Sequence, residues 1–157
     1  MSFLVQWTYL VSLALWLGGI VFFSFFTTPV VFSHLPKELA SEFLAALFPR
    51  YYALGYTAGG LMLLASLLEA ALLRQIPWIR LGVVVLMLGC TLYAGLVLRP
   101  QVHELKVQLR SVEEGTELGN HLKASFDQLH RFSVILNLIV LVGGLILIGI
   151  VALRLRL

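Results

Sequence analysis

Charged residues are scarce in this sequence, and their scarcity excludes most classes of soluble protein. Lys, Arg, Asp and Glu make up 12% of the 157 residues, whereas hydrophobic residues make up 60%. Soluble domains carry about 25% charged and about 45–50% apolar residues. We therefore expect a single-domain integral membrane protein.

Basic runs, cysteine pairs and catalytic motifs are absent as well. The net charge of +3 is spread along the chain, so nucleic acid is not an expected partner. The single Cys90 cannot form a disulfide within the chain, and in its apolar run it is expected to be a buried core residue. The sequence has no nucleophile elbow, no phosphate-binding glycine loop and no Cys-His or His-x-x-x-His motif. We therefore favour a non-enzymatic protein.

Residues 1–36 contain no charged side chain. A secretory signal peptide would have a basic start, an apolar core of about 7–15 residues and a small-x-small cleavage site. Here the apolar stretch continues to Phe32, and no Ala-x-Ala sequence follows it. A retained membrane span is therefore expected over about residues 4–32.

Three further apolar runs are long enough to cross a bilayer, whose hydrocarbon core is about 30 Å thick. The spans are expected at about residues 51–73, 81–98 and 132–153. The short link between the second and third spans makes them an antiparallel hairpin. The predicted fold class is an all-α, four-helix bundle embedded in the lipid bilayer.

Two amphipathic segments connect these spans. Pro36 and the four-residue spacing of the apolar residues after it predict a short interfacial helix over about residues 36–48, closed by Pro49. Apolar residues at helical spacing continue through residues 99–131, with a break at Gly115. The third and fourth spans are therefore expected to extend beyond the bilayer as a protruding helical hairpin.

Small residues indicate where helices pack closely inside a membrane. The candidates are Gly18 and Gly19 in the first span and Gly55 and Gly59, one turn apart, in the second. The second pair suits either packing within the chain or a symmetric contact between copies. The sequence leaves the oligomeric state open.

One acidic residue, Glu69, lies inside an apolar span. It is about one turn from Arg74, so we expect it to reach the membrane surface or to pair with Arg74 or Arg80. The alternative is a buried functional carboxylate.

Polar residues gather where the spans reach the side of the protruding hairpin. Helical spacing places four of them on one face of the fourth helix and two on one face of the third. If these faces oppose each other, they form one cluster; otherwise they are ordinary interface residues where helices leave the membrane. The candidate ligand-binding residues are Arg99, His103, Asp127, His130, Ser133 and Asn137.

Metal binding is another interpretation of the same region. Two histidines on facing helices can hold haem iron, and two or three can hold copper. Three histidines, His34, His103 and His130, lie at span ends on this side. Haem b and copper are therefore candidate cofactors, and an organic ligand or a solute path is the third interpretation.

Four ordered motifs resemble a known family. They are Trp16-Leu17-Gly18-Gly19 with the later Pro29, Leu47 to Tyr52, Arg99-Pro100, and Phe126 to Asn137. The set resembles the bacterial members of a four-span membrane family of unknown function that includes transmembrane protein 205. That family is distantly similar to copper-resistance D proteins and to the membrane protoporphyrinogen oxidase that carries haem b.

This resemblance implies a link to metal or drug tolerance and identifies no catalytic residue. Its recurrent polar positions are Arg99, His130, Ser133 and Asn137, whereas His103 is added from helical spacing alone. The leading expectation is a protein that binds or moves a metal ion, haem or a small amphipathic solute. The alternatives are a haem-dependent membrane oxidoreductase and a structural or assembly subunit of a membrane complex.

An even number of spans puts both termini on one side of the membrane. The positive-inside rule counts Lys and Arg near span ends. Their total number favours the hairpin side as cytoplasmic, whereas their density in the shortest segments favours the terminal side. We expect a bacterial inner-membrane protein with both termini in the cytoplasm.

Overall fold

The computed structural model describes residues 3–74, 76–112 and 115–154. Within these ranges the chain forms helices and no strand. The first long helix consists of α1 (Phe3–Val21), the π-helical segment η1 (Phe22–Thr27) and α2 (Thr28–His34), and the second is α3 (Lys37–Leu73). The third consists of α4 (Trp78–Tyr93), the π-helical segment η2 (Ala94–Leu98) and α5 (Arg99–Arg110), and the fourth is α6 (Glu117–Arg154).

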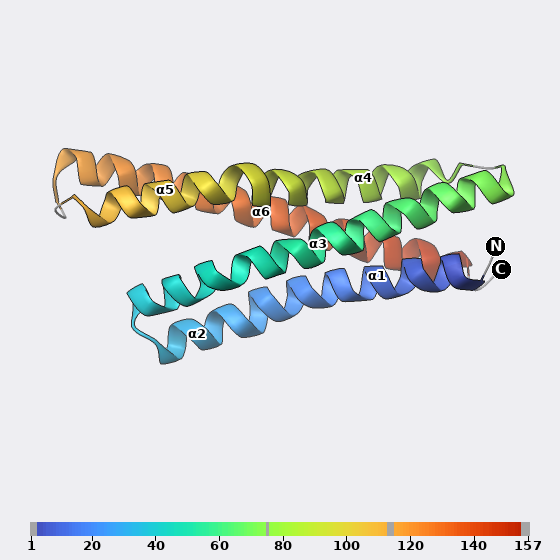
Figure 1. Ribbon diagram of the computed structural model, residues 1–157, viewed down its shortest axis with the longest axis horizontal. Coiled ribbons are helices and arrows are strands. Elements are labelled where there is room, and N and C mark those ends of the chain that lie inside the picture. Colours follow the sequence, from blue (N-terminus) through green and yellow to red (C-terminus); the bar gives the residue numbers. More distant parts are fainter. Residues whose placement is uncertain (1–2, 75, 113–114, 155–157) are drawn as a thin grey trace.

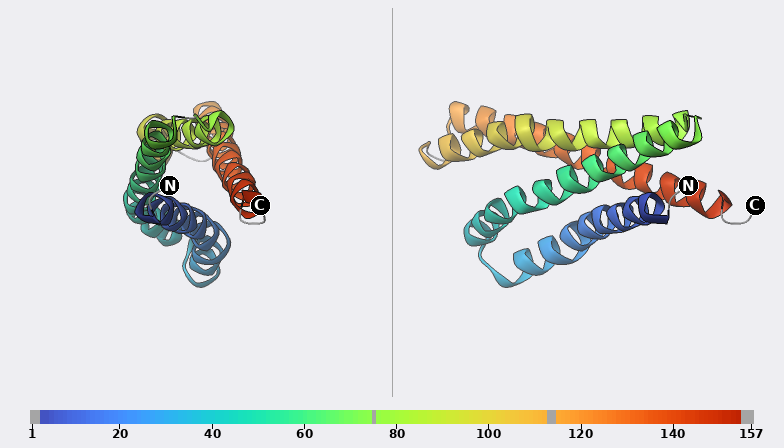
Figure 2. Two further views of the ribbon diagram at one scale, coloured as in Figure 1. Left: turned by 90° about the vertical axis from the view of Figure 1, so that its right-hand side faces the viewer. Right: turned by 45° about the vertical axis from the view of Figure 1, so that its right-hand side comes forward.

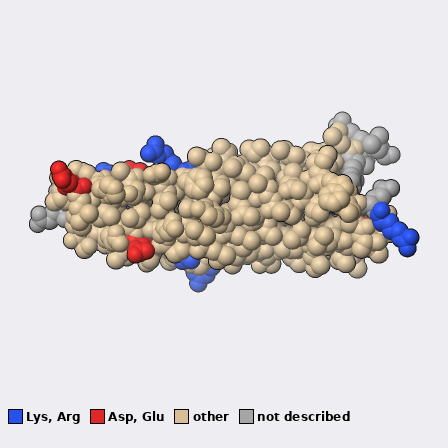
Figure 3. Space-filling model, turned by 90° about the horizontal axis from the view of Figure 1, so that it is seen from above, with Lys and Arg blue, Asp and Glu red and all other residues tan. Residues whose placement is uncertain are grey.

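These four helices are long and apolar enough to cross a membrane, with lengths of 32, 37, 33 and 37 residues in the described ranges. At 1.5 Å per residue, each exceeds the hydrocarbon thickness of about 30 Å. Figure 3 shows charged residues towards the two ends of the molecule, with a belt free of charge between them. The all-α fold class and the four spans predicted from the sequence are confirmed.

The side chains on the outside of this belt are those that lipid covers. Large apolar residues such as Leu15, Leu86 and Leu138 are more than half exposed. A soluble monomer rarely exposes so much contiguous apolar surface. The bundle therefore buries a narrow core and leaves most of its apolar surface to the bilayer.

The helix expected over residues 36–48 is present, but it is not a separate element. It continues through Pro49 into the second span as the single helix α3. Its buried face runs on through the proline, from Ala40 and Leu44 to Tyr52. Continuous packing on one face maintains the helix across the one backbone hydrogen bond that proline cannot donate.

The two other helical prolines each follow a π-helical segment. Pro29 lies two residues beyond η1, and Pro100 lies two residues beyond η2. The N–H of Thr28 donates to the carbonyl of Phe23, and the N–H of Arg99 donates to that of Ala94, both five residues back. A wider turn relieves the clash between a proline ring and the carbonyl four residues before it. The helices thus accommodate both prolines through π-helical turns.

The helices pack in an open arc. α3 lies between α1 and α4, and α6 packs along α4 and α5 and also touches α1. The end-on view in Figure 2 shows this arc, and Figure 1 shows both termini at the same end. At the other end, α5 and the start of α6 run side by side, away from α2 (Figures 1 and 2).

A pair of glycines in α6 allows it to cross two other helices closely. A methyl group on Gly143 would come within 2.9 Å of the Met87 side chain in α4, and one on Gly144 would meet Leu17 in α1. Small residues permit such close approach in membrane bundles. At this crossing α6 contacts α4 through Gly143 and α1 through Gly144.

Candidate functional site

Asn137 of α6 joins three helices through side-chain hydrogen bonds. Its Oδ1 accepts a hydrogen bond from the Tyr51 hydroxyl of α3 at 2.5 Å. Its Nδ2 donates to Ser24 Oγ in η1 at 3.2 Å. A buried amide needs such partners because leaving it unpaired in an apolar environment is costly. The sequence-predicted site residue Asn137 is therefore in contact with two residues that spacing did not identify.

A second set of polar contacts follows along the same helices, towards the protruding hairpin. The Tyr52 side chain interacts with Ser133, one turn before Asn137 on α6. The Arg99 guanidinium interacts electrostatically with Tyr52 and Tyr56. Arg99 itself is exposed and begins α5, directly after η2. The site thus passes from neutral hydrogen bonds among the helices to a cation at its outer end.

Gly95 of η2 lets the two tyrosines approach this end of the site. A methyl group on Gly95 would lie 2.9 Å from the Tyr52 ring and would collide with the Tyr56 hydroxyl. Gly95 is five residues before Pro100, and Ser24 is five residues before Pro29. Each π-helical segment therefore contributes one small residue to the site, a placement in keeping with the frequent occurrence of π-helical turns at functional sites.

Aromatic rings form one wall of the site. Phe23 stacks on Tyr51 with 4.7 Å between ring centroids, and Phe48 stacks on Tyr52 at 6.1 Å. Tyr52 in turn stacks on Tyr56 at 6.2 Å. Such ring pairs add stability beyond their buried area and restrict the tyrosine rotamers.

We call this site the tyrosine cluster. It is formed by Ser24, Tyr51, Tyr52, Tyr56, Arg99, Ser133 and Asn137.

Three of the six sequence-predicted ligand-binding residues, namely Arg99, Ser133 and Asn137, are brought together in the tyrosine cluster. The other three, His103, Asp127 and His130, are exposed on α5 and α6. In the described part of the chain their side chains form no hydrogen bond or ion pair, although the His130 ring stacks on Phe126. Apolar neighbours such as Leu105 and Leu129 are less exposed than these three residues. The two predicted faces therefore meet only at Arg99, Ser133 and Asn137, and the other three side chains lie on the outside of the helices.

The three candidate metal ligands lie on three separate helices. His34 is exposed at the end of α2, where its Nδ1 is 2.9 Å from the Val30 carbonyl oxygen and 2.8 Å from Ser33 Oγ. His103 lies on α5 and His130 on α6. Among the residues that the structure describes, no three His, Cys, Asp or Glu side chains are grouped to hold a metal ion.

The sequence contained signals for the residues that were missed. An interfacial aromatic belt is one interpretation of Tyr51, Tyr52 and Tyr56. It explains how deep these residues lie in the membrane, but it does not predict that their side chains point into the bundle. Tyr52 is on the same helical face as Gly55, a position that predicts a helix contact. Ser24 lies between two pairs of phenylalanines in η1. A polar residue in such a run, together with the need of Asn137 for a partner, could have suggested the pairing.

Of the four glycines expected at helix contacts, three lie where another helix approaches closely and one does not. A methyl group on Gly19 would lie 2.7 Å from Leu54, and on Gly59 it would lie 2.8 Å from Trp16. At Gly55 it would lie 2.9 Å from Thr91. Gly18 has nothing within 4 Å, so it takes part in no close contact among the described helices.

A separate polar site lies near the end of the bundle that carries the termini. Arg80 of α4 forms an ion pair with Glu69 of α3, at 2.7 Å between Nη1 and Oε2. The Arg80 guanidinium carbon also lies 4.1 Å from the centre of the Tyr9 ring in α1. All three residues are less than 5% exposed. The pairing of Glu69 with Arg80, one of the expectations from the sequence, is confirmed, and it ties together the α3–α4 hairpin.

Comparison with known proteins gives a family without a defined activity. No curated protein and no solved structure matches the chain. A family described as a domain of unknown function (DUF4149) matches residues 11–111, which is well over half of the chain. This match includes Arg99 and the three tyrosines, while Ser133 and Asn137 lie beyond it. The chain belongs to the DUF4149 family.

Proposed function

We propose that the protein binds a small amphipathic molecule at the tyrosine cluster and catalyses no reaction. The observation that carries this proposal is the electrostatic imbalance of the cluster. Its one charged residue is Arg99, and the ion pairs among the described residues, Glu69–Arg80 and Glu42–Arg110, do not include it. A cation beside two phenol groups, with no carboxylate paired to it, suits an anionic head group.

The chemistry of the residues agrees with such a ligand. A guanidinium donates paired hydrogen bonds to a carboxylate or phosphate, and a phenol adds a further donor. The aromatic wall of Phe23, Phe48 and Tyr51 offers apolar contact to the body of the ligand. The head group would therefore lie at Arg99 and Tyr56, with the apolar part among the helices.

Thermal unfolding in detergent tests this proposal with two probes of the same chain length, octanoate and octylamine. Octanoate is expected to raise the melting temperature of the wild-type protein, whereas octylamine is not. Arg99→Gln is expected to abolish the octanoate effect. Arg50→Gln is a matched control because Arg50 is also exposed and immediately precedes Tyr51. Equal stabilisation by both probes, or by octanoate in Arg99→Gln, would contradict the proposal.

Haem or copper binding is the second candidate. Its support is the resemblance to the family of transmembrane protein 205, and the candidate ligands on the adjacent helices α5 and α6 are His103 and His130. A Soret band and a stoichiometric metal content in purified protein would favour it and would open the route to an oxidoreductase. Protein that stays colourless after addition of haem would exclude the haem-dependent activity.

We also propose that the protein lies in a bacterial inner membrane with both termini in the cytoplasm. The support is the density of Lys and Arg in the short segments at that end, where the link 74–80 carries Arg74 and Arg80.

A further inference from the structure

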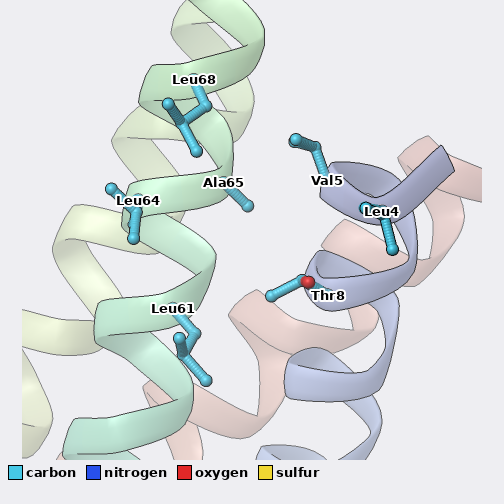
Figure 4. A pocket seen from close by; sticks show the side chains of 7 residues that line it. All are labelled: Leu4, Val5, Thr8, Leu61, Leu64, Ala65 and Leu68. Carbon is cyan, nitrogen blue, oxygen red and sulfur yellow. The ribbon is translucent and has the colours of Figure 1, made fainter. Parts of the chain in front are cut away.

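A shallow apolar groove lies between α1 and α3, near the end of the bundle that carries the termini, and it shares no lining residue with the tyrosine cluster. Its volume is about 170 Å³, and it opens to the outside between α1 and α3. Figure 4 shows Val5 and Thr8 of α1 extending towards α3, which contributes Leu61, Leu64 and Leu68 to the lining. Thr8 contributes the one hydroxyl group among otherwise hydrocarbon side chains.

The position of the groove points to its occupant. Its lining belongs to two helices that are apolar enough to span the membrane. Leu61, Leu64 and Leu68 are 41%, 53% and 45% exposed, so the described chain leaves them uncovered. The volume is below the roughly 300–1,000 Å³ of sites that enclose a compact ligand. A groove of this kind fits a segment of one hydrocarbon chain from the surrounding bilayer.

A basic residue lies beyond the same end of α3. Arg74 ends the helix in the left-handed conformation, with φ 51°, and its side chain is exposed. It is six residues beyond Leu68, roughly 9 Å at the helical rise. In the described ranges it forms no ion pair. Basic residues directly next to a span attract anionic lipid head groups.

We propose that this groove binds one acyl chain of an anionic phospholipid, with the phosphate of that lipid at Arg74. The lipid comes from the leaflet on the side of the termini. Its chain would lie along Thr8 of α1 and along Leu61 and Leu68 of α3, which line the groove (Figure 4). This site is independent of the tyrosine cluster.

Native mass spectrometry of the protein released from detergent tests the site, with dioleoyl-phosphatidylglycerol and dioleoyl-phosphatidylcholine as probes. The wild-type protein is expected to retain one phosphatidylglycerol molecule and less phosphatidylcholine. Thr8→Phe places a ring in the groove and is expected to abolish this adduct. Thr57→Phe is the matched control, because Thr57 is an exposed threonine of α3 outside the groove. Arg74→Gln is expected to abolish the preference between the two lipids.

Retention of the adduct by Thr8→Phe at the wild-type level would overturn the proposal, as would equal retention of both lipids by the wild-type protein. If Thr8→Phe loses its helical circular dichroism, Leu68→Phe replaces it, because Leu68 lies on the exposed side of the groove. Arg99→Gln is expected to keep the adduct. This result separates the groove from the tyrosine cluster, so either proposal can fail alone.

Discussion

At the scale of single residues, Asn137 shows how one polar side chain fixes helix positions inside a membrane. It holds Tyr51 of α3 and Ser24 of η1 by hydrogen bonds. Side-chain hydrogen bonds between membrane helices contribute about 0.6 kcal/mol on average and up to about 1.7 kcal/mol. Each bond contributes little free energy. Together the two bonds specify how the three helices are aligned, because only one register satisfies both.

A double-mutant cycle of Tyr51→Phe and Asn137→Leu measures this contact directly. We expect each single variant to destabilise the protein and the coupling free energy to be about 1 kcal/mol. Reversible unfolding in mixed detergent micelles gives the required free energies of unfolding. Thr57→Val serves as a control, because the Thr57 hydroxyl bonds only within its own helix. A coupling near zero would show that the two side chains are not in contact.

Breaking the buried ion pair between Glu69 and Arg80 is expected to lower the free energy of unfolding more than breaking the Tyr51–Asn137 hydrogen bond. Glu69→Leu alone leaves the Arg80 charge in an apolar environment beside Tyr9. Removing one partner of a buried pair costs about 3–5 kcal/mol, whereas replacing both by apolar residues is often neutral. We therefore expect Glu69→Leu to be severely destabilised and Glu69→Leu with Arg80→Met to recover most of the loss. Additive destabilisation in the double variant would argue against the pair as a structural unit.

At the scale of elements, the π-helical segments bring small residues against the tyrosines. In η2, Gly95 leaves no space for a methyl group next to Tyr52 and Tyr56. Gly89, in α4, has nothing within 4 Å of the same position. The two glycines therefore differ in function although both lie in the third span.

Substitution by alanine distinguishes the roles of Gly95 and Gly89. Gly95→Ala is expected to destabilise the protein by about 1–3 kcal/mol, because it forces the tyrosines out of their rotamers. Gly89→Ala is expected to be neutral or stabilising by up to about 1 kcal/mol, since alanine favours the helix. Unfolding in mixed micelles and near-ultraviolet circular dichroism of the tyrosines provide the measurements. Equal effects of the two variants would contradict the close contact at η2.

The number and positions of the long helices are predictable from the sequence, whereas their contacts are not. Runs without charge predict the four spans, because lipid tolerates few charges and only long helices cross it. The pattern around Pro49 predicted a break that does not occur, since packing of Leu44 and Tyr52 on one face outweighs one missing hydrogen bond. Helical periodicity assigns residues to a face, but it cannot say which helix that face meets.

The candidate site illustrates this limit. Ser133 and Asn137 were correctly placed on one face, yet that face meets the tyrosines of α3 and Ser24, not His103. His103 and His130 are exposed, whereas apolar neighbours such as Leu105 and Leu129 are less exposed. A pairing between distant helices depends on the crossing angles of the whole bundle, and no single helix encodes these.

At the scale of the whole molecule, both termini lie at one end, and the protruding part of α5 and α6 lies at the other (Figure 1). The proposed orientation puts the link 74–77 in the cytoplasm and Ser111 in the periplasm. In a Cys90→Ala background, Ser111→Cys is expected to react with a membrane-impermeant maleimide on intact cells. Ile76→Cys is expected to react only after permeabilisation. The reverse pattern would invert the orientation and leave the fold unchanged.

The most direct test of ligand binding at the tyrosine cluster is saturation-transfer difference NMR of octanoate with the protein in detergent. We predict transfer to the octanoate chain in the wild-type protein and in Arg50→Gln, with loss of the saturable signal in Arg99→Gln and in Gly95→Val. Undiminished saturable transfer in both of these variants would place octanoate elsewhere and would contradict the assignment of the cluster as the binding site.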